Sequence, residues 1–336
     1  MDLNILWFIL ITVLFTGFFF LEGFDYGVGM TIPFISSSEN NRTLVINTIA
    51  PVWDGNEVWM ITAGGALFAA FPHVYATMFS TFYLALFIML VGLILRGAGL
   101  ELRGKHESYT WRRLWDWAIC LGSAIPAFLW GVAVTNLLRG LPISDKMIYM
   151  GTFYDLLSPY TVVGGITFLL VFLFHGMAFL NLRLVEGSLT HRMRDWAIRV
   201  GALAIFFFLV CIAMTYTLTD LFRSTLAAGL LFGAAICFAG AYLASFHRRG
   251  IPAFIGSALA IACTTVAFFA GLFPRLMVSS LQPEWSLTIY NASSTPYTLT
   301  IMSIAAGCLV PIVLIYQGWS YWIFRKRLSR KDLELY

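Results

Sequence analysis

Long apolar segments recur along the whole of this 336-residue sequence, and their length decides what the chain can fold into. A helix needs about 20 mostly apolar residues to cross the hydrocarbon core of a bilayer. Nine segments meet this condition, near residues 3–26, 48–70, 75–97, 115–138, 157–182, 197–218, 223–246, 251–273 and 298–323. A hydrophobic fraction of 60% with only 11% charged residues excludes an ordinary soluble domain. The sequence therefore predicts an all-α, polytopic integral membrane helical bundle of about nine transmembrane helices.

Individual segments refine this prediction. The first lacks a basic flank and a small-residue cleavage site, so we interpret it as a retained helix rather than a signal peptide. The second is the weakest candidate because two acidic residues lie near its start. Pro126 and Pro311 fall inside the fourth and ninth segments and predict kinks there. We expect one transmembrane domain over residues 1–336, built as two four-helix bundles plus one peripheral helix.

Basic residues are distributed unevenly between the two sides of the predicted bundle. Seventeen of the 21 Lys and Arg lie in or beside the connections that follow segments one, three, five, seven and nine. The other four lie on the opposite side: Arg139, Lys146, Arg223 and Arg275. Because basic connections stay in the cytoplasm, the sequence predicts an N-terminus outside and a C-terminus inside. An odd number of spans is required for that orientation.

Cysteine and histidine residues give little support for a metal or haem site in this chain. The five cysteines lie at wide spacings inside apolar segments, without a CxxC motif: Cys120, Cys211, Cys237, Cys263 and Cys308. We expect buried, inert thiols. Only His175 lies inside a span, and a lone buried histidine is more often a hydrogen-bonded core residue than a haem ligand. With no phosphate-binding, nucleophile or zinc-protease motif, we expect neither catalytic residues nor metal ligands.

Two acidic motifs interrupt the apolar sequence, one with Glu22 and Asp25 and the other with Asp54 and Glu57. Each motif places two carboxylates three residues apart, on one face of a helix. The predicted topology brings all four to the cytoplasmic ends of neighbouring spans, where Arg96 could act as a charge partner. Burial and mutual repulsion favour protonated carboxyl groups. We therefore expect some of these acids to exchange protons near neutral pH.

Three interpretations of the acids remain open at this point. They could form a proton route, because carboxylates inside a membrane usually mark an ion or proton path. They could instead bind substrate or coupling ions in a stand-alone proton-coupled transporter. That function is typical of broken helices in two related halves, a repeat we do not find in this sequence. Finally, the acids could have a purely structural role, in which they cap helix starts and hydrogen-bond backbone groups in a glycine-rich helix crossing.

Five stretches of sequence are together distinctive, namely GFDYGVGM, INTIAPVWDGNEVWMITAGGALFAAFP, WRRLWDW, LFHGMAFL and SLTIYNASSTPYTLTIM. In this order they resemble subunit II of the cytochrome bd quinol oxidases, from the first span to the ninth. The resemblance implies a multi-pass subunit of the bacterial or archaeal cytoplasmic membrane, in a complex that oxidises quinol and reduces oxygen to water. It implies haem b and haem d ligated by a partner, subunit I, with none ligated by this chain. It leaves room for a small third single-helix subunit and implies no nucleic-acid partner.

The resemblance also carries expectations for particular residues. It places Asp25 and Asp54 at positions associated with structure or with a cytoplasmic proton route, to which we add Glu22 and Glu57. The chain departs from the family at Asn291, where an acid is expected, so any role of a carboxylate there is lost. A small-residue face in the second segment would permit close approach of a partner helix. The residues that we expect at this partner interface are Gly64, Gly65, Ala66 and Ala69.

Overall fold

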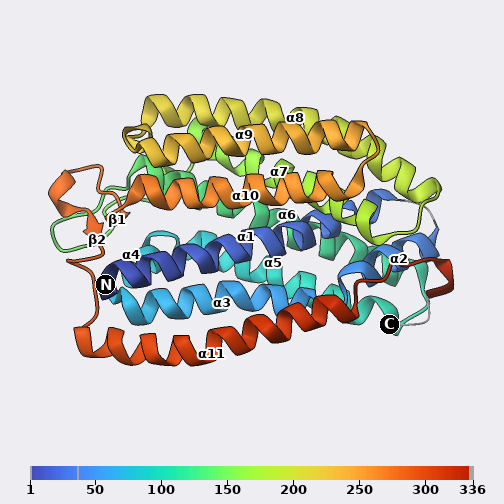
Figure 1. The fold of residues 1–336 in the computed structure, drawn as a ribbon, viewed down its shortest axis with the longest axis horizontal. Coiled ribbons are helices and arrows are strands. Elements are labelled where there is room, and N and C mark those ends of the chain that lie inside the picture. Colours follow the sequence, from blue (N-terminus) through green and yellow to red (C-terminus); the bar gives the residue numbers. More distant parts are fainter. Residues whose placement is uncertain (1, 36–37, 333–336) are drawn as a thin grey trace.

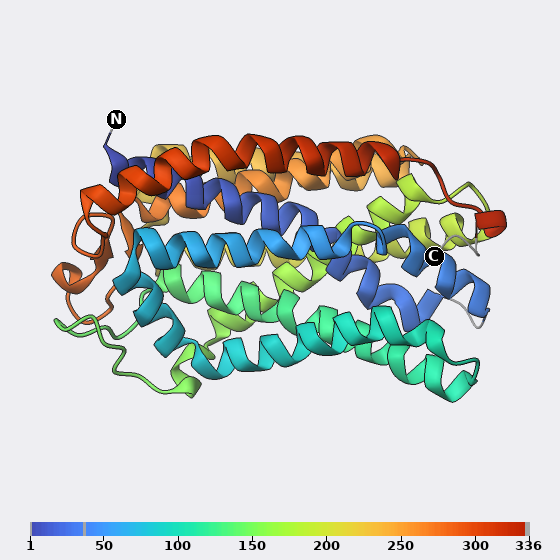
Figure 2. The ribbon, with the colours of Figure 1, turned by 90° about the horizontal axis from the view of Figure 1, so that it is seen from below.

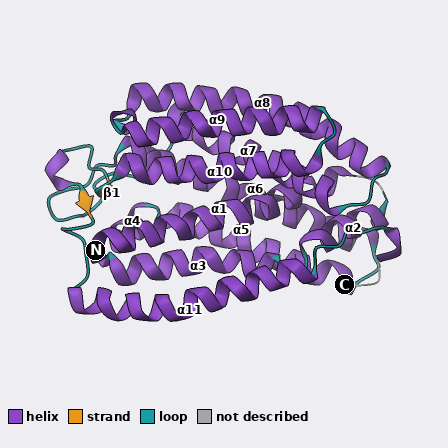
Figure 3. Cartoon of the chain, in the orientation of Figure 1, coloured by secondary structure: helices purple, strands orange, loops and turns teal. Residues whose placement is uncertain are grey.

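The computed structural model describes residues 2–35 and 38–332, and it consists almost entirely of helices (Figure 3). The α-helices are α1 (Leu3–Ile35), α2 (Glu39–Ile49), α3 (Trp53–Ala70), α4 (Pro72–Thr81), α5 (Tyr83–Leu102), α6 (Tyr109–Arg139), α7 (Pro159–Arg183), α8 (Ser188–Leu218), α9 (Thr225–Phe246), α10 (Gly250–Leu272) and α11 (Pro296–Ile323). Short 3-10 helices are η1 (Arg103–Lys105), η2 (Phe153–Leu156), η3 (Leu221–Arg223), η4 (Pro283–Trp285) and η5 (Arg330–Asp332). Two strands, β1 (Arg275–Met277) and β2 (Leu287–Thr288), pair antiparallel.

Among the described residues, eight helices are long and apolar enough to cross a membrane: α1, α5, α6, α7, α8, α9, α10 and α11. This agrees with the predicted polytopic helical bundle. The second predicted segment corresponds to α3, which has 18 residues and carries Asp54 and Glu57. It lies beside α1 and α11 along the length of the bundle (Figure 1).

The predicted ends of the first two segments are wrong. Helix α1 does not stop near residue 26 but continues through Pro33 to Ile35. The second helix begins at Trp53 rather than near residue 48, and the intervening polar stretch forms the unpredicted helix α2. Hydropathy could not reveal α2, because charged contacts with other helices hold it in place.

Helix α2 is anchored by a network of ion pairs at the basic end of the bundle. Arg42 contacts Asp116 of α6 at 3.2 Å, and Arg103 contacts the same carboxylate at 2.6 Å. Glu39 pairs with Arg42 at 2.9 Å and with Arg103 at 2.8 Å. Asp116 is fully buried, and removing a carboxylate from water costs free energy. Its ion pairs with the two arginines offset that cost.

Helix α1 occupies the centre of the molecule and packs against α3, α6, α7 and α10. Helices α7, α8, α9 and α10 pack next to one another on one side of it (Figure 1). Helix α11 lies along the outside, next to α1 and α3 (Figure 2). Within α11 only Leu299 is buried, so most of this apolar helix faces away from the chain.

A close crossing of α1 and α7 sets the position of the acidic motif in α1. A Cβ atom on Gly27 would collide with the backbone of Phe172 and Gly176, so only glycine permits this approach. Gly27, two residues after Asp25, is therefore needed for the close packing of α1 against α7.

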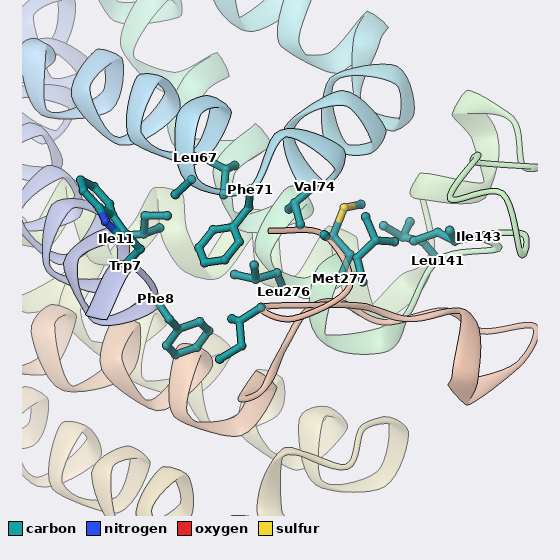
Figure 4. Packing of buried hydrophobic residues seen from close by; sticks show 14 of the residues in the cluster. Trp7, Phe8, Ile11, Leu67, Phe71, Val74, Leu141, Ile143, Leu276 and Met277 are labelled. Atoms are coloured by element: carbon teal, nitrogen blue, oxygen red, sulfur yellow. The ribbon is translucent and has the colours of Figure 1, made fainter. Parts of the chain in front are cut away.

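The connection over residues 274–297 contributes to the hydrophobic core at one end of the bundle. Its residues Leu276 and Met277 are buried in a hydrophobic cluster with Trp7 and Phe71 (Figure 4). The N–H of Leu141 donates to the carbonyl of Val278 at 2.9 Å, joining two connections at this end. Together they close the end of the bundle where α1 begins (Figure 1).

The predicted burial of the cysteines is only partly correct. Cys120 is buried, whereas three others are half-buried and Cys308 is exposed on this chain. Cys308 lies on α11, whose peripheral position leaves most of its side chains without contacts in the bundle.

Candidate functional site

A polar cluster lies between α1, α3, α5 and α11, and the acidic motif of α1 is at its centre. Glu22 of α1 forms a direct ion pair with Arg96 of α5, and both side chains are fully buried. The spacing of the motif places Asp25 almost one turn further along the same helix, also fully buried. Arg96, suggested by the sequence as a charge partner, therefore pairs with Glu22 of this motif.

The Arg96 guanidinium is held by aromatic rings as well as by charge. It lies 4.9 Å from the ring centre of Tyr26 and 5.9 Å from that of Trp53. Cations are attracted to aromatic faces, and the attraction grows where water is excluded. Because these rings come from α1 and α3, they help to position Arg96 between the two acidic motifs.

Asn56 connects the motif of α3 to the motif of α1. Its Nδ2 donates a hydrogen bond of 2.7 Å to Oδ2 of Asp25. Its Oδ1 accepts a hydrogen bond of 2.7 Å from the hydroxyl of Tyr321 on α11. A second link to α11 runs through Trp59, whose Nε1 donates to Oε1 of Gln317 at 2.8 Å.

The two acids of the α3 motif have different positions from those of α1. Asp54 is exposed on the surface of this chain, and Glu57 is partly buried. Neither has a hydrogen bond or an ion pair to the buried cluster among the described residues. The structure thus brings Glu22 and Asp25 together with Arg96, while Asp54 lies outside that group.

Several buried atoms of the cluster have no hydrogen-bond partner within residues 2–35 and 38–332. They are Oε2 of Glu22, Oδ1 of Asp25, the hydroxyl of Tyr26, and Nε and Nη2 of Arg96. Such atoms are almost always paired with protein groups or ordered water. The unpartnered atoms in this cluster include both hydrogen-bond donors and acceptors, as expected at a site that binds water.

Sequence reasoning missed Asn56, Gln317 and Tyr321. Asn56 lies inside the acidic motif of α3, so its amide was visible but was not counted as a site residue. Gln317 and Tyr321 are four residues apart in an apolar helix, which places two polar groups on one helix face. That spacing is the signal that could have identified α11 as part of the cluster.

His175 lies in the interior of α7 and is fully buried. Its Nδ1 is 2.7 Å from Oγ of Ser257, and its Nε2 is 3.2 Å from the carbonyl oxygen of Phe20. The ring stacks on Phe254 with 4.8 Å between centroids. Both nitrogens are thus within hydrogen-bond distance of protein oxygens, the arrangement typical of a core histidine.

The expected partner face on α3 is open at Gly64 and Gly65, whereas Ala66 packs against the hydrophobic cluster of this chain and Ala69 is half-buried. A Cβ atom on Gly64 or Gly65 would meet no atom within 4 Å.

Asn291, where an acid is expected in the family, orders a loop. Its Oδ1 accepts a hydrogen bond from the Thr288 N–H at 2.7 Å, and its Nδ2 donates a hydrogen bond to the Ser286 carbonyl at 3.0 Å.

Comparison with known proteins gives a consistent result over the full chain. Residues 3–324 match the model of the family described as cytochrome bd terminal oxidase subunit II. The chain is 43% identical over 333 residues to cytochrome bd ubiquinol oxidase subunit 2 of Bacillus subtilis (strain 168), covering 98% of both. It is 36% identical over 371 residues to cytochrome bd-I ubiquinol oxidase subunit 2 of Escherichia coli (strain K12), covering 99% of this chain and 97% of that protein.

A solved structure has a similar fold. A chain of the bd oxidase from Geobacillus thermodenitrificans superposes with a TM-score of 0.78, covering 97% of this chain and 100% of that chain. Sequence identity is 18%, so this likeness concerns the fold alone.

Proposed function

This chain belongs to the family of cytochrome bd terminal oxidase subunit II, and from that premise we propose its role. It supports the haem-bearing subunit and carries protons toward the site where oxygen is reduced. The chain is thus a bacterial multi-pass membrane protein and one subunit of an oxidoreductase complex. The family match gives no support to a stand-alone transporter, and the bacterial relatives give none to an archaeal origin. As the relatives are ubiquinol oxidases, we take a quinol as the electron donor and oxygen as the acceptor.

We place the haems of the complex, haem b and haem d, in the partner subunit. Haem iron needs an axial ligand with a free lone pair facing the metal. His175 does not fit this requirement, because both ring nitrogens face protein oxygens and its ring is stacked on Phe254. The described residues contain no group of three or more His, Cys, Asp or Glu suited to a metal ion. In this proposal the chain supports the haem-bearing subunit without supplying an axial ligand.

The proton route begins, in this proposal, at Asp54 and Glu57. Both lie near the start of α3, at the end of the bundle where the basic connections gather, and Asp54 is exposed. Oxygen reduction consumes protons inside the membrane, where water is scarce, so chains of carboxylates and bound water must supply them. The route continues to Asp25 and Glu22, which are one helix away.

Water completes the route around the buried cluster. The unpartnered oxygens of Glu22 and Asp25 point to bridging water molecules, which would relay protons between the two acids. Arg96 stabilises the negatively charged form of Glu22, because an ion pair offsets part of the free-energy cost of burying a carboxylate. The role of Arg96 is to position and balance charge rather than to transfer a proton.

We further propose nine spans, counting α3, with the N-terminus outside and the C-terminus in the cytoplasm. The 17-to-4 distribution of Lys and Arg supports this orientation. Helices α1, α3, α5 and α6 would form one four-helix bundle and α7 to α10 the other, with α11 as the peripheral helix. In support, α1 packs against α3 and α6 in one bundle and α10 packs against α7 and α9 in the other; α7 also packs against α1 and α6 and so joins the two bundles.

The partner subunit docks, in this proposal, on the face formed by α3 and α11. The open surface at Gly64 and Gly65 and the exposed length of α11 support this site. Small residues let helix backbones approach closely in a membrane, where close packing drives association. A small third single-helix subunit could join the complex elsewhere.

Purification of the tagged chain in mild detergent tests the proposed function. We expect a second polypeptide of similar or larger size to co-purify, with a visible haem spectrum. A chain that purifies alone and without haem, while retaining proton-coupled uptake of a solute in vesicles, would contradict the proposal.

A further inference from the structure

A cavity of about 520 Å³ lies at the basic end of the bundle, next to the polar cluster, from which Tyr321 contributes to its wall. Its walls come from α1, α2, α7, α10, α11 and the segment after α11, and they are largely apolar, with aromatic rings that include Phe24, Phe179 and Phe254. A volume of this size is within the range of small-molecule sites. Nothing in the proposed proton route uses this cavity.

Three arginines also line the cavity: Arg183, Arg325 and Arg327. Arg325 and Arg327 are exposed, so the cavity reaches the surface of the chain on the arginine side. No carboxylate is among its described lining residues, and neither Arg325 nor Arg327 has an ion pair within the part of the chain that the structure describes. The cavity thus combines an apolar interior with positive charge at its mouth.

Backbone hydrogen bonds hold this basic segment in place. The N–H of Leu328 donates to the carbonyl of Arg183 at 2.8 Å, and the N–H of Val185 donates to the carbonyl of Leu328 at 3.0 Å. The chain after α11 is therefore fixed against the end of α7, so Arg327 stays close to the cavity. A backbone held in place lowers the entropic cost of ordering this segment around a ligand.

We propose that this cavity binds an anionic phospholipid, with an acyl chain among the aromatic side chains and the headgroup phosphate on Arg325 and Arg327. Basic pockets between transmembrane helices are suited to anionic headgroups. Guanidinium groups match phosphate geometry through paired hydrogen bonds. The inference does not depend on the proton route, because the cavity shares only Tyr321 with the polar cluster.

Lipid retention by the purified two-subunit oxidase tests this inference. The complex is delipidated by detergent exchange and incubated with equal amounts of phosphatidylglycerol and phosphatidylethanolamine, and bound lipids are counted by native mass spectrometry. We expect selective retention of phosphatidylglycerol by the wild type. The double variant Arg325→Gln/Arg327→Gln should lower that retention about 30-fold, because each basic residue contributes ~1 kcal/mol.

The matched control is Lys105→Gln/Arg199→Gln, which removes the same charge from two exposed positions outside the cavity. It should retain phosphatidylglycerol as the wild type does. Equal losses in the two double variants, equal retention of both lipids, or a neutral lipid or quinone in the cavity would overturn the proposal.

A second measurement needs no variant and so does not depend on folding of the double mutant. A phosphatidylglycerol with a photoreactive acyl chain is irradiated with the wild-type oxidase. Cross-links should concentrate on the peptides around Phe179 and Phe254. Labelling spread evenly over the exposed faces of α8, α9 and α11 would contradict a specific acyl site.

Discussion

Asn56 on α3 donates a hydrogen bond of 2.7 Å to the fully buried carboxyl group of Asp25 on α1. The same amide accepts a hydrogen bond from Tyr321 on α11. One side chain therefore joins three helices, two of which carry the acidic motifs of the sequence. This bond connects the proposed proton route to the face on which we place the partner subunit.

Replacing Asn56 by alanine should destabilise the assembled oxidase. The change leaves a buried oxygen of Asp25 without its donor, and loss of a partner to a buried polar group costs about 1–3 kcal/mol. Haem loss during a thermal ramp measures the effect. Tyr321→Phe removes only the hydroxyl contact and should cause a smaller shift. Equal shifts in the temperature of haem loss would show that the hydrogen bond to Asp25 contributes no more to stability than the one from Tyr321.

The buried ion pair of Glu22 and Arg96 predicts a compensating double variant. Arg96→Gln leaves a buried carboxylate uncompensated, a change that typically costs about 3–5 kcal/mol. We expect little assembled complex from this variant, measured as haem per membrane protein. Glu22→Gln/Arg96→Gln removes both charges and should recover part of the yield. A double variant no better than Arg96→Gln would show that the pairing of charges is not what stabilises this region.

Gly65→Leu tests the proposed partner face. A side chain at this position meets no atom within 4 Å in this chain, so the chain itself should tolerate leucine. An unwanted side chain in a packed interface costs about 1–3 kcal/mol, and we expect less co-purified partner and a lower haem yield. Gly229→Leu on α9 is the matched control, because that glycine also has open space around it. Equal yields for both variants would remove this part of α3 from the interface.

Cysteine labelling tests the proposed orientation. Ser188 at the start of α8 and Ser280 in the connection after β1 are both exposed. Single cysteines introduced there should react with an impermeant maleimide from opposite sides of the membrane, position 280 from outside. The background comes from the unsubstituted chain with its five native cysteines. Labelling of both positions from the outside would show that the topology is wrong.

The sequence predicts much of this fold because bilayer crossing imposes a length and a composition on each helix. The later segments show this clearly: the prediction of 223–246 matches Thr225–Phe246 closely. The helix α2 escaped detection because its stability comes from Arg42 and Asp116, which are 74 residues apart in the chain. Hydropathy within a window carries no information about such a contact.

The candidate site was predictable to a lesser degree. A buried carboxylate is conspicuous in an apolar segment, so Glu22 and Asp25 could be identified. The exposure of Asp54 could not be predicted, because it depends on where α3 begins, and that in turn depends on where α2 ends. Gln317 and Tyr321 were overlooked because polar residues that can hydrogen-bond are common in membrane helices. Their four-residue spacing marks one polar face of α11, but the contact of that face with Asn56 of α3 is visible only in the packed structure.

Oxygen consumption by Asp54→Asn tests the central claim, that protons enter through these acids, most directly. Asparagine keeps the shape and most of the hydrogen bonding of the side chain but cannot exchange a proton, so assembly and the haem spectrum should be largely retained. Turnover per haem should fall about tenfold, less than the ~100-fold or more typical of a positioned acid–base group, because Glu57 and water remain. Asp145→Asn, an exposed change at the opposite end of the bundle, is the control. Reduced turnover across pH 6–8 with an intact haem spectrum is the predicted result, and turnover equal to that of the wild type over this range would contradict the proton-entry role.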